Sequence, residues 1–323
     1  MGKATYWVGF DLGGTKMMAT VFDANFKAVA SDRRKTKGNL GLESVLERIY
    51  KTIDEAVSKA GLTNKQLSGI GVGCPGPLNL DKGIVLEAPN LGWTNVPLKT
   101  RLEKRFGCPA LIANDVDAGT YGEYKFGAGK KARCLLGVFP GTGLGGACIY
   151  EGKVFRGRTG SCMEIGHFPV DARGPVGAPG RCGSLESMTS RLAISAQAAQ
   201  AVYRGQAPAL QHLAGTRLEN IKSGTLALAI EQGDTIVEEI VRHSARILGT
   251  TIAGVVNILA PDILVLGGGL VESLPQLYLE EVRATVDHEA LPAYAKPLRV
   301  VAAKLGDNAG VMGAAALIAD AAQ

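Results

Sequence analysis

Apolar residues follow a strand-like pattern at the start of the chain and a helical one soon after. Residues 6–22 hold two apolar runs on either side of a glycine pair, which predicts a β-hairpin, and a third strand is expected near 28–31. Over 44–60 the apolar positions recur at helical spacing before the stop at Gly61; they are Val45, Leu46, Ile49, Ile53 and Val57. A hairpin followed by an amphipathic helix is therefore predicted.

Strands and helices continue to alternate beyond this helix. A buried strand is predicted over 67–72, a helix over 97–106, a short strand over 110–113 and a second apolar hairpin over 135–150. Strand–helix–strand order is typical of α/β layers.

Helices dominate the last third of the chain. Asp234 is the predicted N-cap of a long helix that ends near Leu259, because Pro261 cannot continue it. Strands are expected over 263–266 and 298–303, before an alanine-rich C-terminal helix.

Two domains are expected, with a boundary near residue 115. The first, 1–115, is a small α/β domain, and the C-terminal helix, about 308–323, is expected to pack back on it. The second, 116–307, is a larger α/β domain. The length of 323 residues is enough for two domains with full cores.

Each hairpin carries a glycine–threonine turn at its tip. Glycine lets backbone amides approach an anion, and successive N–H groups form an anion-binding nest. Two such turns at equivalent places predict a duplicated fold that binds the phosphates of one nucleotide from both sides. The glycines after the strand 263–266 are expected to pack against an adenine. The predicted nucleotide-binding residues are Gly13, Gly14, Thr15, Lys16, Gly141, Thr142, Gly143, Gly145, Gly268 and Gly269, with Asp11 beside the first turn.

Other nucleotide-binding motifs do not fit the chain. It contains no GxxxxGK[ST] string, and residues 141–146 have the spacing GxGxGG before a strand, where a dinucleotide fingerprint has GxGxxG before a helix. Two strand–turn–strand phosphate loops instead predict the two-domain actin-like/hexokinase-like ATPase architecture, a ribonuclease H-like α/β fold with an interdomain cleft.

Composition excludes several classes of function. With 46% hydrophobic and 20% charged residues and a net charge of +5, the chain is typical of globular proteins. The basic cluster at 33–37 is short and without aromatic interleaving, so neither nucleic acid nor membrane is an expected partner. Six dispersed cysteines and a start without a signal-peptide pattern lead us to expect a cytoplasmic protein.

The ordered set of motifs resembles the ROK (repressor, ORF, kinase) family, and its pattern is most similar to bacterial glucokinases. The resemblance covers essentially the whole chain, although the family's repressors carry an N-terminal helix-turn-helix that is not expected here. It rests on residues 11–16, 75–77, 88–93, 114–115, 141–143, 164–167, 185–186, 267–269 and 307–310.

The resemblance implies an ATP- and Mg²⁺-dependent hexose kinase that phosphorylates the 6-hydroxyl of glucose. Asp115, just past a buried strand, is suited to accept the proton of the attacking hydroxyl. The alternative is a purely structural role, as the N-cap of the next helix. Asn114 is expected to contact a neighbouring hydroxyl. Asp11 is expected to hold Mg²⁺, directly or through water, to offset the triphosphate charge.

Further sugar contacts follow from the family. Glu164 and His167 are implied to bind sugar hydroxyls, and Glu186 is a third polar contact that rests mostly on the resemblance. Gly76 and Asn90 are expected on the sugar side, although Asn90 could simply belong to a loop held by a buried Trp93.

Two departures from the family pattern affect the expected site. Many relatives hold a structural zinc with one histidine and three cysteines, but Gly177, Pro179 and Ser184 stand at the cysteine positions, so no zinc is expected. Met163 stands where relatives usually have glycine, which leaves the identity of the sugar open.

Several alternatives remain open at this point. N-acetylmannosamine, N-acetylglucosamine and fructose are the alternative sugars, and polyphosphate is an alternative donor without support in the residues. A non-catalytic sugar sensor and a generic ATPase are the competing classes. The resemblance also implies a homodimer.

Overall fold

The computed structural model describes residues 5–158, 160–177 and 181–322 and confirms the mixed α/β class. The chain divides into two compact units. Unit 1 comprises Met1–Lys131, Ala147–Cys162 and Asp307–Gln323, and unit 2 comprises Ala132–Gly146 and Met163–Gly306. Among the described residues, no helix combines the length and apolar character needed to cross a membrane.

Unit 1 is built around a five-stranded sheet with the order β3-β2-β1-β4-β8. The predicted first hairpin is present, since β1 and β2 pair antiparallel, while β4 runs parallel to both β1 and β8. The third strand is longer than the predicted 28–31. Its second half is polar, so no apolar pattern marked it as a strand. The strands are β1 (Tyr6–Leu12), β2 (Lys16–Phe22), β3 (Ala28–Lys35), β4 (Leu67–Cys74) and β8 (Ala110–Asn114).

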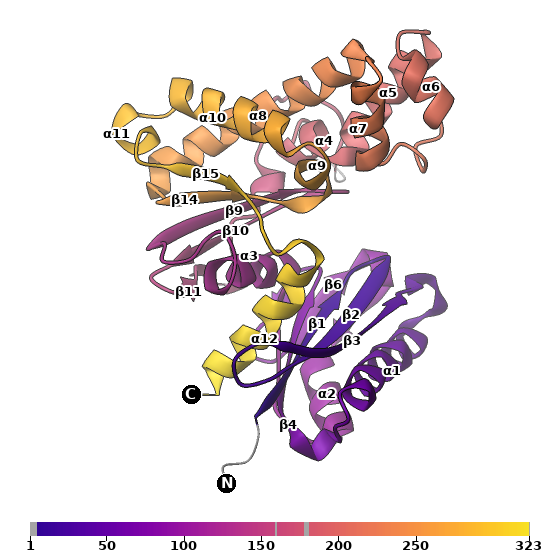
Figure 1. Cartoon of the computed structure of the whole chain (residues 1–323), viewed down its shortest axis with the longest axis vertical. Coiled ribbons are helices and arrows are strands. Elements are labelled where there is room, and N and C mark those ends of the chain that lie inside the picture. The colour runs from indigo at the N-terminus through magenta and orange to yellow at the C-terminus, as the bar shows by residue number, and fades with distance from the viewer. Residues whose placement is uncertain (1–4, 159, 178–180, 323) are drawn as a thin grey trace. The chain divides into compact units, whose positions relative to one another are not determined.

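Helices cover both faces of this sheet (Figure 1). Alternate residues of β1 (Val8, Phe10 and Leu12) share one buried core with the apolar stripes of α1 (Leu42–Lys59) and α2 (Leu98–Phe106). On the other face lie α3 (Asp115–Lys125) and α12 (Ala309–Ala321). Glycine allows this close approach: a Cβ on Gly9 would lie 1.8 Å from the Val311 carbonyl oxygen.

Two small sheets complete unit 1. The first is β5 (Leu78–Asn79), β6 (Ile84–Ala88) and β7 (Trp93–Val96), and the second is β12 (Arg156–Gly157) with β13 (Gly160–Ser161). These strands were not predicted because they are too short to show an apolar period.

The second large sheet has the order β11-β10-β9-β14-β15, and β14 is parallel to both β9 and β15. The division between the units falls within β10. The second predicted hairpin corresponds to β9 and β10. The strands are β9 (Cys134–Pro140), β10 (Leu144–Tyr150), β11 (Lys153–Val154), β14 (Ile263–Leu266) and β15 (Arg299–Ala302).

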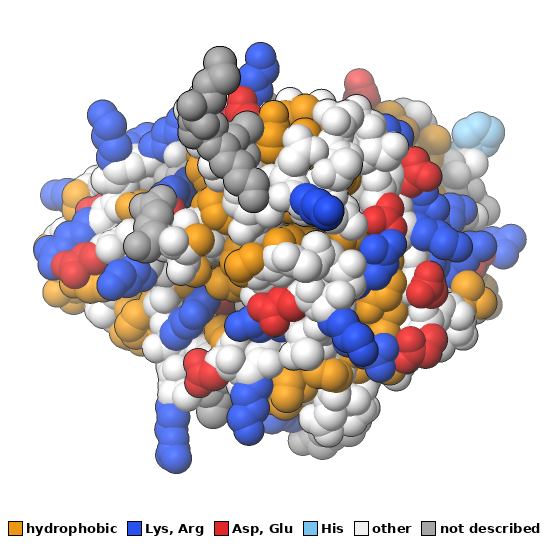
Figure 2. Space-filling view, turned by 90° about the horizontal axis from the view of Figure 1, so that it is seen from below, with side chains coloured by type: hydrophobic (Ala, Val, Ile, Leu, Met, Phe, Trp, Pro, Cys, Tyr) orange, Lys and Arg blue, Asp and Glu red, His pale blue; other side chains and the backbone are white. Residues whose placement is uncertain are grey.

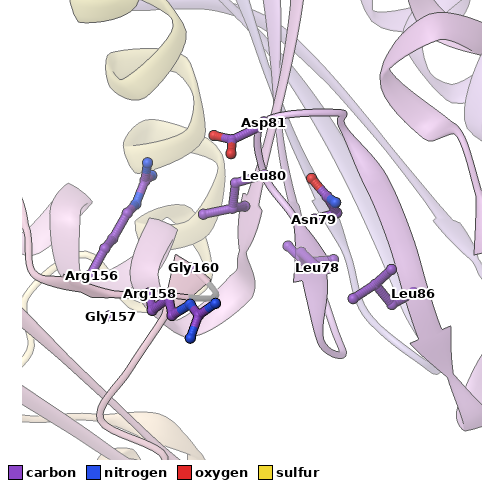
Figure 3. A pocket seen from close by; sticks show the side chains of 9 residues that line it. All are labelled: Leu78, Asn79, Leu80, Asp81, Leu86, Arg156, Gly157, Arg158 and Gly160. Carbon is purple, nitrogen blue, oxygen red and sulfur yellow. The ribbon is translucent and has the colours of Figure 1, made fainter.

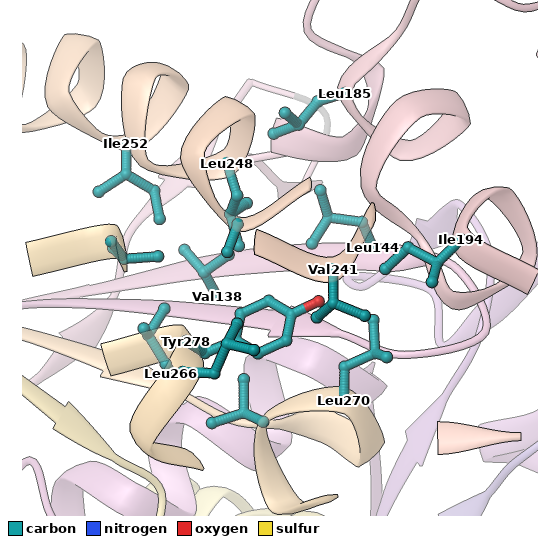
Figure 4. Close-up of a cluster of buried hydrophobic side chains, with 14 of the residues drawn as sticks. Val138, Leu144, Leu185, Ile194, Val241, Leu248, Ile252, Leu266, Leu270 and Tyr278 are labelled. Atoms are coloured by element: carbon teal, nitrogen blue, oxygen red, sulfur yellow. The ribbon is translucent and has the colours of Figure 1, made fainter. Parts of the chain in front are cut away.

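Unit 2 has its own hydrophobic core, in which strand residues such as Val138 and Leu266 meet helix residues such as Val241, Leu248 and Tyr278 (Figure 4). Removing these side chains from water is the main stabilising contribution. The helices of unit 2 are α4 (Leu185–Thr189), α5 (Arg191–Tyr203), α6 (Pro208–Leu213), α7 (Ser223–Glu231), α8 (Thr235–Leu259), α9 (Gly268–Ser273), α10 (Pro275–Glu289) and α11 (Pro292–Ala295).

Asp234 precedes α8 as predicted, but its side chain does not cap that helix. Its two carboxylate oxygens accept hydrogen bonds from the amides of Ala209 (3.1 Å) and Leu210 (2.7 Å), in the first turn of α6. The N-cap interpretation was therefore wrong about the helix that this carboxylate serves, because the tertiary contact outcompetes the local one.

The units divide later in the chain than residue 115. Helix α3 belongs to unit 1 because it packs tightly against α12: a Cβ on Gly122 would lie 2.3 Å from the Ala309 carbonyl oxygen. Helix α12 itself contacts β1 and β4.

Charged side chains of both signs are interspersed on the face shown in Figure 2. This agrees with the small net charge of +5.

Candidate functional site

Two carboxylates of unit 1 come from the ends of neighbouring parallel strands. Asp11 on β1 lies opposite Gly73 on β4, and Cys74 lies opposite Asn114, the last residue of β8. Asp115 follows directly as the first residue of α3. Because the carboxyl ends of parallel strands meet at one edge of the sheet, Asp11, Asn114 and Asp115 gather where α/β proteins bind ligands.

Asn114 takes the capping role that had been considered for Asp115. Its Oδ1 atom accepts hydrogen bonds from the amides of Val116 (2.8 Å) and Asp117 (3.2 Å). The Asn114 amide nitrogen takes no part in this capping, and the Asp115 carboxylate accepts a hydrogen bond from the adjacent Val116 amide (3.0 Å). Asp115 is an acidic residue in the first turn of α3, the end of a helix at which negative charge is favourable.

Asp11 carries the clearest electrostatic perturbation of the site. Burial and, next, repulsion from the Asp115 charge raise the pKa of its carboxyl group to about 6, against the attraction of Lys16. Two carboxylates that repel each other at a strand edge are a suitable oxygen donor set for a divalent cation, so Asp11 fits the magnesium role expected of it. Among the described residues, no group of three or more metal-ligating side chains is present.

The first glycine turn is fixed by a buried threonine. The Gly13 amide donates a hydrogen bond to the Lys16 carbonyl oxygen (3.0 Å). Thr36 donates two: its Oγ1 hydroxyl to the Gly13 carbonyl oxygen (2.6 Å), and its amide to the Thr15 carbonyl oxygen (2.8 Å). Gly14 and Thr15 are exposed. Thr36 belongs to no motif that would have indicated this role.

Two predicted sugar-side residues, Asn90 and Gly76, lie in unit 1, and Asn90 is near this turn. A Cβ on Gly14 would come within 3.3 Å of the Cβ of Asn90, which sits in a 3₁₀ turn (Pro89–Leu91). The buried side chains of Leu91 and Trp93 hold this loop while Asn90 stays exposed, so the structural interpretation applies and the sugar contact of Asn90 stays a prediction. Gly76 has φ = 95°, and a Cβ there would meet the Glu87 carbonyl oxygen at 1.9 Å.

A charge cluster adjoins the first turn. Asp307 pairs with Lys16 (2.6 Å) and with Arg33 (2.8 Å), and hydrogen bonding to Lys16 lowers the pKa of the Asp307 carboxyl group. Asp307 lay in a motif of the family but had no assigned role.

The second glycine turn lies in unit 2 and depends on Glu186. The Gly141 amide donates to the Gly143 carbonyl oxygen (2.9 Å), and Oε2 of Glu186 accepts from the Leu144 amide (2.8 Å). A Cβ on Gly143 would come within 2.4 Å of that same oxygen. Glu186 therefore supports the turn, a role that its predicted sugar contact did not include. Gly145 continues from the turn into β10.

Glu164 and His167 flank a short 3₁₀ turn (Ile165–His167) of unit 2 and are both exposed, while Ile165 and Gly166 between them are buried. Met163 has φ = 64°, in the left-handed region that favours glycine. The glycine usual in relatives therefore matches the backbone conformation observed at this position.

A cavity of about 430 Å³ in unit 2 adjoins the second turn through Arg191. Gly269 lines it, as the adenine prediction requires, while Gly268 (φ = 80°) packs on Pro140. Arg191 also lines the cavity and donates to Oγ1 of Thr142 (3.0 Å). The remaining described lining residues were not predicted, since they belong to no motif. They come from α5, α7, α9 and the segment before α7: Leu192, Leu218, Glu219, Lys222, Ser223, Gly224, Glu272 and Ser273.

Comparison with known proteins identifies the relatives of this chain. The model of the ROK family matches residues 7–321. The chain belongs to the ROK family. This confirms the resemblance inferred from the motifs.

Relatives within the ROK family include both regulators and enzymes. The chain is 34% identical over 276 residues to a putative xylose repressor of Caldicellulosiruptor sp. strain Rt8B.4, which covers 85% of this chain and 68% of that protein. It is 31% identical over 312 residues to a glucokinase of Thermotoga maritima, covering 96% of each. A crystal structure of a ROK family glucokinase from Streptomyces griseus, in complex with glucose and AMPPNP, has a TM-score of 0.83 at 30% identity and covers 97% of this chain and 98% of that one. The hexokinase-like fold expected from the paired turns is thereby confirmed.

Backbone hydrogen bonds join the described parts of the segment in which ROK relatives were expected to hold zinc. The Val170 amide donates to the Gly183 carbonyl oxygen (2.8 Å), and the Gly183 amide donates to that of Pro175 (2.8 Å). Gly177 and Ser184 contribute no thiolate, and Pro179 lies outside the described residues. The absence of zinc stays a prediction.

Proposed function

We propose that this chain is an ATP-dependent hexose kinase that transfers the γ-phosphate to the 6-hydroxyl of glucose. The observation that carries this proposal is the placement of Asp115 and Asp11 at one strand edge of unit 1. Relatives of both kinds share the fold, so the proposal rests on these residues and not on the family alone.

Asp115 acts as the general base. Its carboxylate accepts the proton of the sugar hydroxyl while that oxygen attacks the γ-phosphorus and the bond to the β-phosphate oxygen breaks. The Asn114 amide nitrogen donates to a neighbouring hydroxyl, because the amide oxygen is engaged in capping α3. Asp11 is the residue that would hold Mg²⁺, which supplies charge neutralisation for the triphosphate.

The glycine turns supply the phosphate contacts. Gly13, Gly14, Gly141 and Gly143 carry no Cβ atom that would keep a phosphate away from the backbone amides of the two turns. In unit 2, the bond between Arg191 and Thr142 links the second turn to the 430 Å³ cavity. We place the adenosine in this cavity and the phosphates toward Thr142.

The remaining sugar contacts come from exposed polar side chains. Glu164 and His167 bind hydroxyls of the sugar, and Asn90 and the backbone at Gly76 supply further contacts. Glu186 supports the phosphate turn and reaches the sugar with its second carboxylate oxygen.

The test is an ADP-release assay against glucose, fructose, N-acetylglucosamine and N-acetylmannosamine. We expect glucose to give the highest kcat/KM. Asp115→Asn should lower kcat by a factor of about 10² to 10⁴, the usual contribution of general-base catalysis. Asp54→Asn, which removes an exposed carboxylate of α1, is the matched control and should leave kcat unchanged. Unchanged kcat in Asp115→Asn would refute the assignment of the base.

A sugar-sensing protein without kinase activity is the second candidate. The 34% identity to a putative xylose repressor favours it. In that case glucose or xylose would bind, as seen by calorimetry, while no sugar would stimulate ADP release. Sugar-independent ADP release would instead indicate a general ATPase. A homodimer and a cytoplasmic location stay predictions; light scattering checks the first.

A further inference from the structure

A second cavity, of about 380 Å³, lies in unit 1 (Figure 3). One wall is the segment 78–81 together with Leu86 of β6, and the other is the hairpin formed by β12 and β13. None of the residues assigned to catalysis, nucleotide or sugar lines it. It is therefore distinct from the site proposed above.

The two walls belong to one compact unit and contact each other. Arg156 pairs with Ser161 across the hairpin, and a Cβ on Gly160 would come within 3.4 Å of the Leu80 side chain and 3.6 Å of the Leu78 carbonyl oxygen. Both walls fall in unit 1. The volume lies within the range of about 300–1,000 Å³ that small-molecule pockets occupy.

The charge of this cavity is unbalanced. Arg156 and Arg158 are exposed, and Figure 3 shows both side chains extending from the hairpin at the cavity. Among the described residues, neither guanidinium group has an ion pair or hydrogen bond, whereas Arg33, Arg101 and Arg105 elsewhere in unit 1 each pair with a carboxylate. Asp81 is the single acidic residue of the lining.

The other lining groups add a polar and an apolar contribution. Asn79 uses its Oδ1 atom to accept from the Lys82 amide (3.0 Å), which leaves its amide nitrogen as a donor. Leu80 and the exposed Leu86 offer apolar contact. The cavity thus combines two guanidinium groups, one carboxylate, one amide and apolar leucine side chains.

We propose that this cavity binds a phosphate monoester of a sugar. Guanidinium groups match phosphate oxygens with two parallel hydrogen bonds, so Arg156 and Arg158 hold the phosphate. Asp81 and Asn79 bind sugar hydroxyls, and the leucines pack against the carbon face of the ring. The product of the reaction proposed above has this chemistry, so the choice of ligand rests on the proposed function.

Two other anions fit less well. The described lining residues include no aromatic side chain on which a nucleotide base would stack. Inorganic phosphate would fill only a small part of 380 Å³ and leave Asp81 without a hydroxyl partner. A sugar phosphate supplies a phosphate group for the arginines and hydroxyl groups for Asp81 and Asn79.

The experiment is calorimetric titration of glucose 6-phosphate into the full chain at saturating glucose, which occupies the catalytic sugar site. Arg156→Gln/Arg158→Gln should weaken binding at least about tenfold, because both guanidinium groups lose their charge-assisted hydrogen bonds to the phosphate. Lys51→Gln/Lys65→Gln, which removes the same two positive charges from exposed positions of unit 1, should leave the affinity within twofold.

Several results would overturn the proposal. They are the absence of binding to the wild-type chain, equal weakening in both double variants, and binding of inorganic phosphate or of a polyglutamate peptide as tight as that of glucose 6-phosphate. The titration is repeated on Asp115→Asn, which has no role in this cavity. Arginine-dependent binding in a chain without kinase activity toward any sugar would refute the proposed function and leave the cavity assignment standing.

Discussion

The ammonium group of Lys16 lies 2.6 Å from Oδ1 of Asp307 and joins the start of β2 to the segment before α12. Arg33 binds the other carboxylate oxygen at 2.8 Å. The side chains of Lys16 and Asp307 are 51% and 50% exposed, so the pair contributes little to stability. Its consequence is positional, because it fixes the Lys16 charge beside the first glycine turn.

Asp307→Asn should therefore affect nucleotide use more than folding. We expect the KM for ATP to rise several-fold, while the free energy of unfolding changes by less than about 1 kcal/mol, as for other exposed ion pairs. Steady-state kinetics and urea denaturation measure the two quantities. Glu55→Gln, which removes an exposed partner of Arg34, is the control and should change neither. Loss of stability without a change in the KM for ATP would show that Asp307 contributes to folding and not to nucleotide use.

Asp11→Asn should stabilise the folded chain at neutral pH and reduce its activity. Burial and Asp115 raise the pKa of Asp11 from 3.8 to about 6, so the folded state binds this proton more tightly than the unfolded state does. The carboxyl group's contribution to stability is fully present below pH 4 and is lost as the pH rises through 6. At pH 7 the neutral amide avoids this loss, which amounts to at most about 3 kcal/mol.

Urea denaturation of both proteins at pH 4 to 7, without added metal, measures this difference. The gap between Asp11→Asn and the wild type should widen between pH 4 and 6 and then stay constant. A gap that does not depend on pH would contradict the perturbed pKa of Asp11.

Glu186 allows its two roles to be separated by substitution. Glu186→Gln keeps an oxygen that accepts from the Leu144 amide, whereas Glu186→Ala removes it. We expect Glu186→Gln to keep the KM for ATP within about twofold and to raise the KM for the sugar, and Glu186→Ala to raise both. Equal KM values for ATP in the two variants would mean that the bond to Leu144 does not shape the second turn.

Much of the site could be predicted because its residues mark the ends of strands. Asp11, Asn114 and Asp115 follow apolar runs, and a run that ends in a polar residue places that residue at a sheet edge. The turns at Gly13 and Gly141 were visible for the same reason.

The parts that the sequence could not predict depend on contacts between distant segments. Asp234 caps α6 and not α8, Thr36 holds the turn at Gly13, and Arg191 links Thr142 to the cavity of unit 2. The first segment of unit 1 extends to Lys131, and not to 115, because α3 packs against α12. None of these contacts leaves a periodic or spaced pattern in the chain.

At position 163, the glycine variant should be more stable than the alanine variant, the reverse of the usual order. Its left-handed backbone (φ = 64°) costs about 1–2 kcal/mol for a residue with a Cβ, and its side chain packs against the core of unit 2. Met163→Ala loses the packing and keeps the cost, whereas Met163→Gly loses the packing and removes the cost. We expect a higher Tm for Met163→Gly than for Met163→Ala, measured by calorimetry. The usual order, with alanine above glycine, would contradict the strained backbone.

The segment 169–184 should be stabilised by its backbone and not by zinc. Gly183 (φ = 58°) leaves no room for a side chain, since a Cβ would lie 1.6 Å from the Asp171 carbonyl oxygen. Gly183→Ala must therefore displace the hydrogen bonds to Val170 and Pro175, and should lower Tm by several degrees, whereas 1,10-phenanthroline should leave the Tm of the wild type unchanged. Gly205→Ala, at a positive φ in open space, controls for the backbone cost alone. A fall in Tm on chelation, with zinc found by elemental analysis, would show that other ligands replace the missing cysteines.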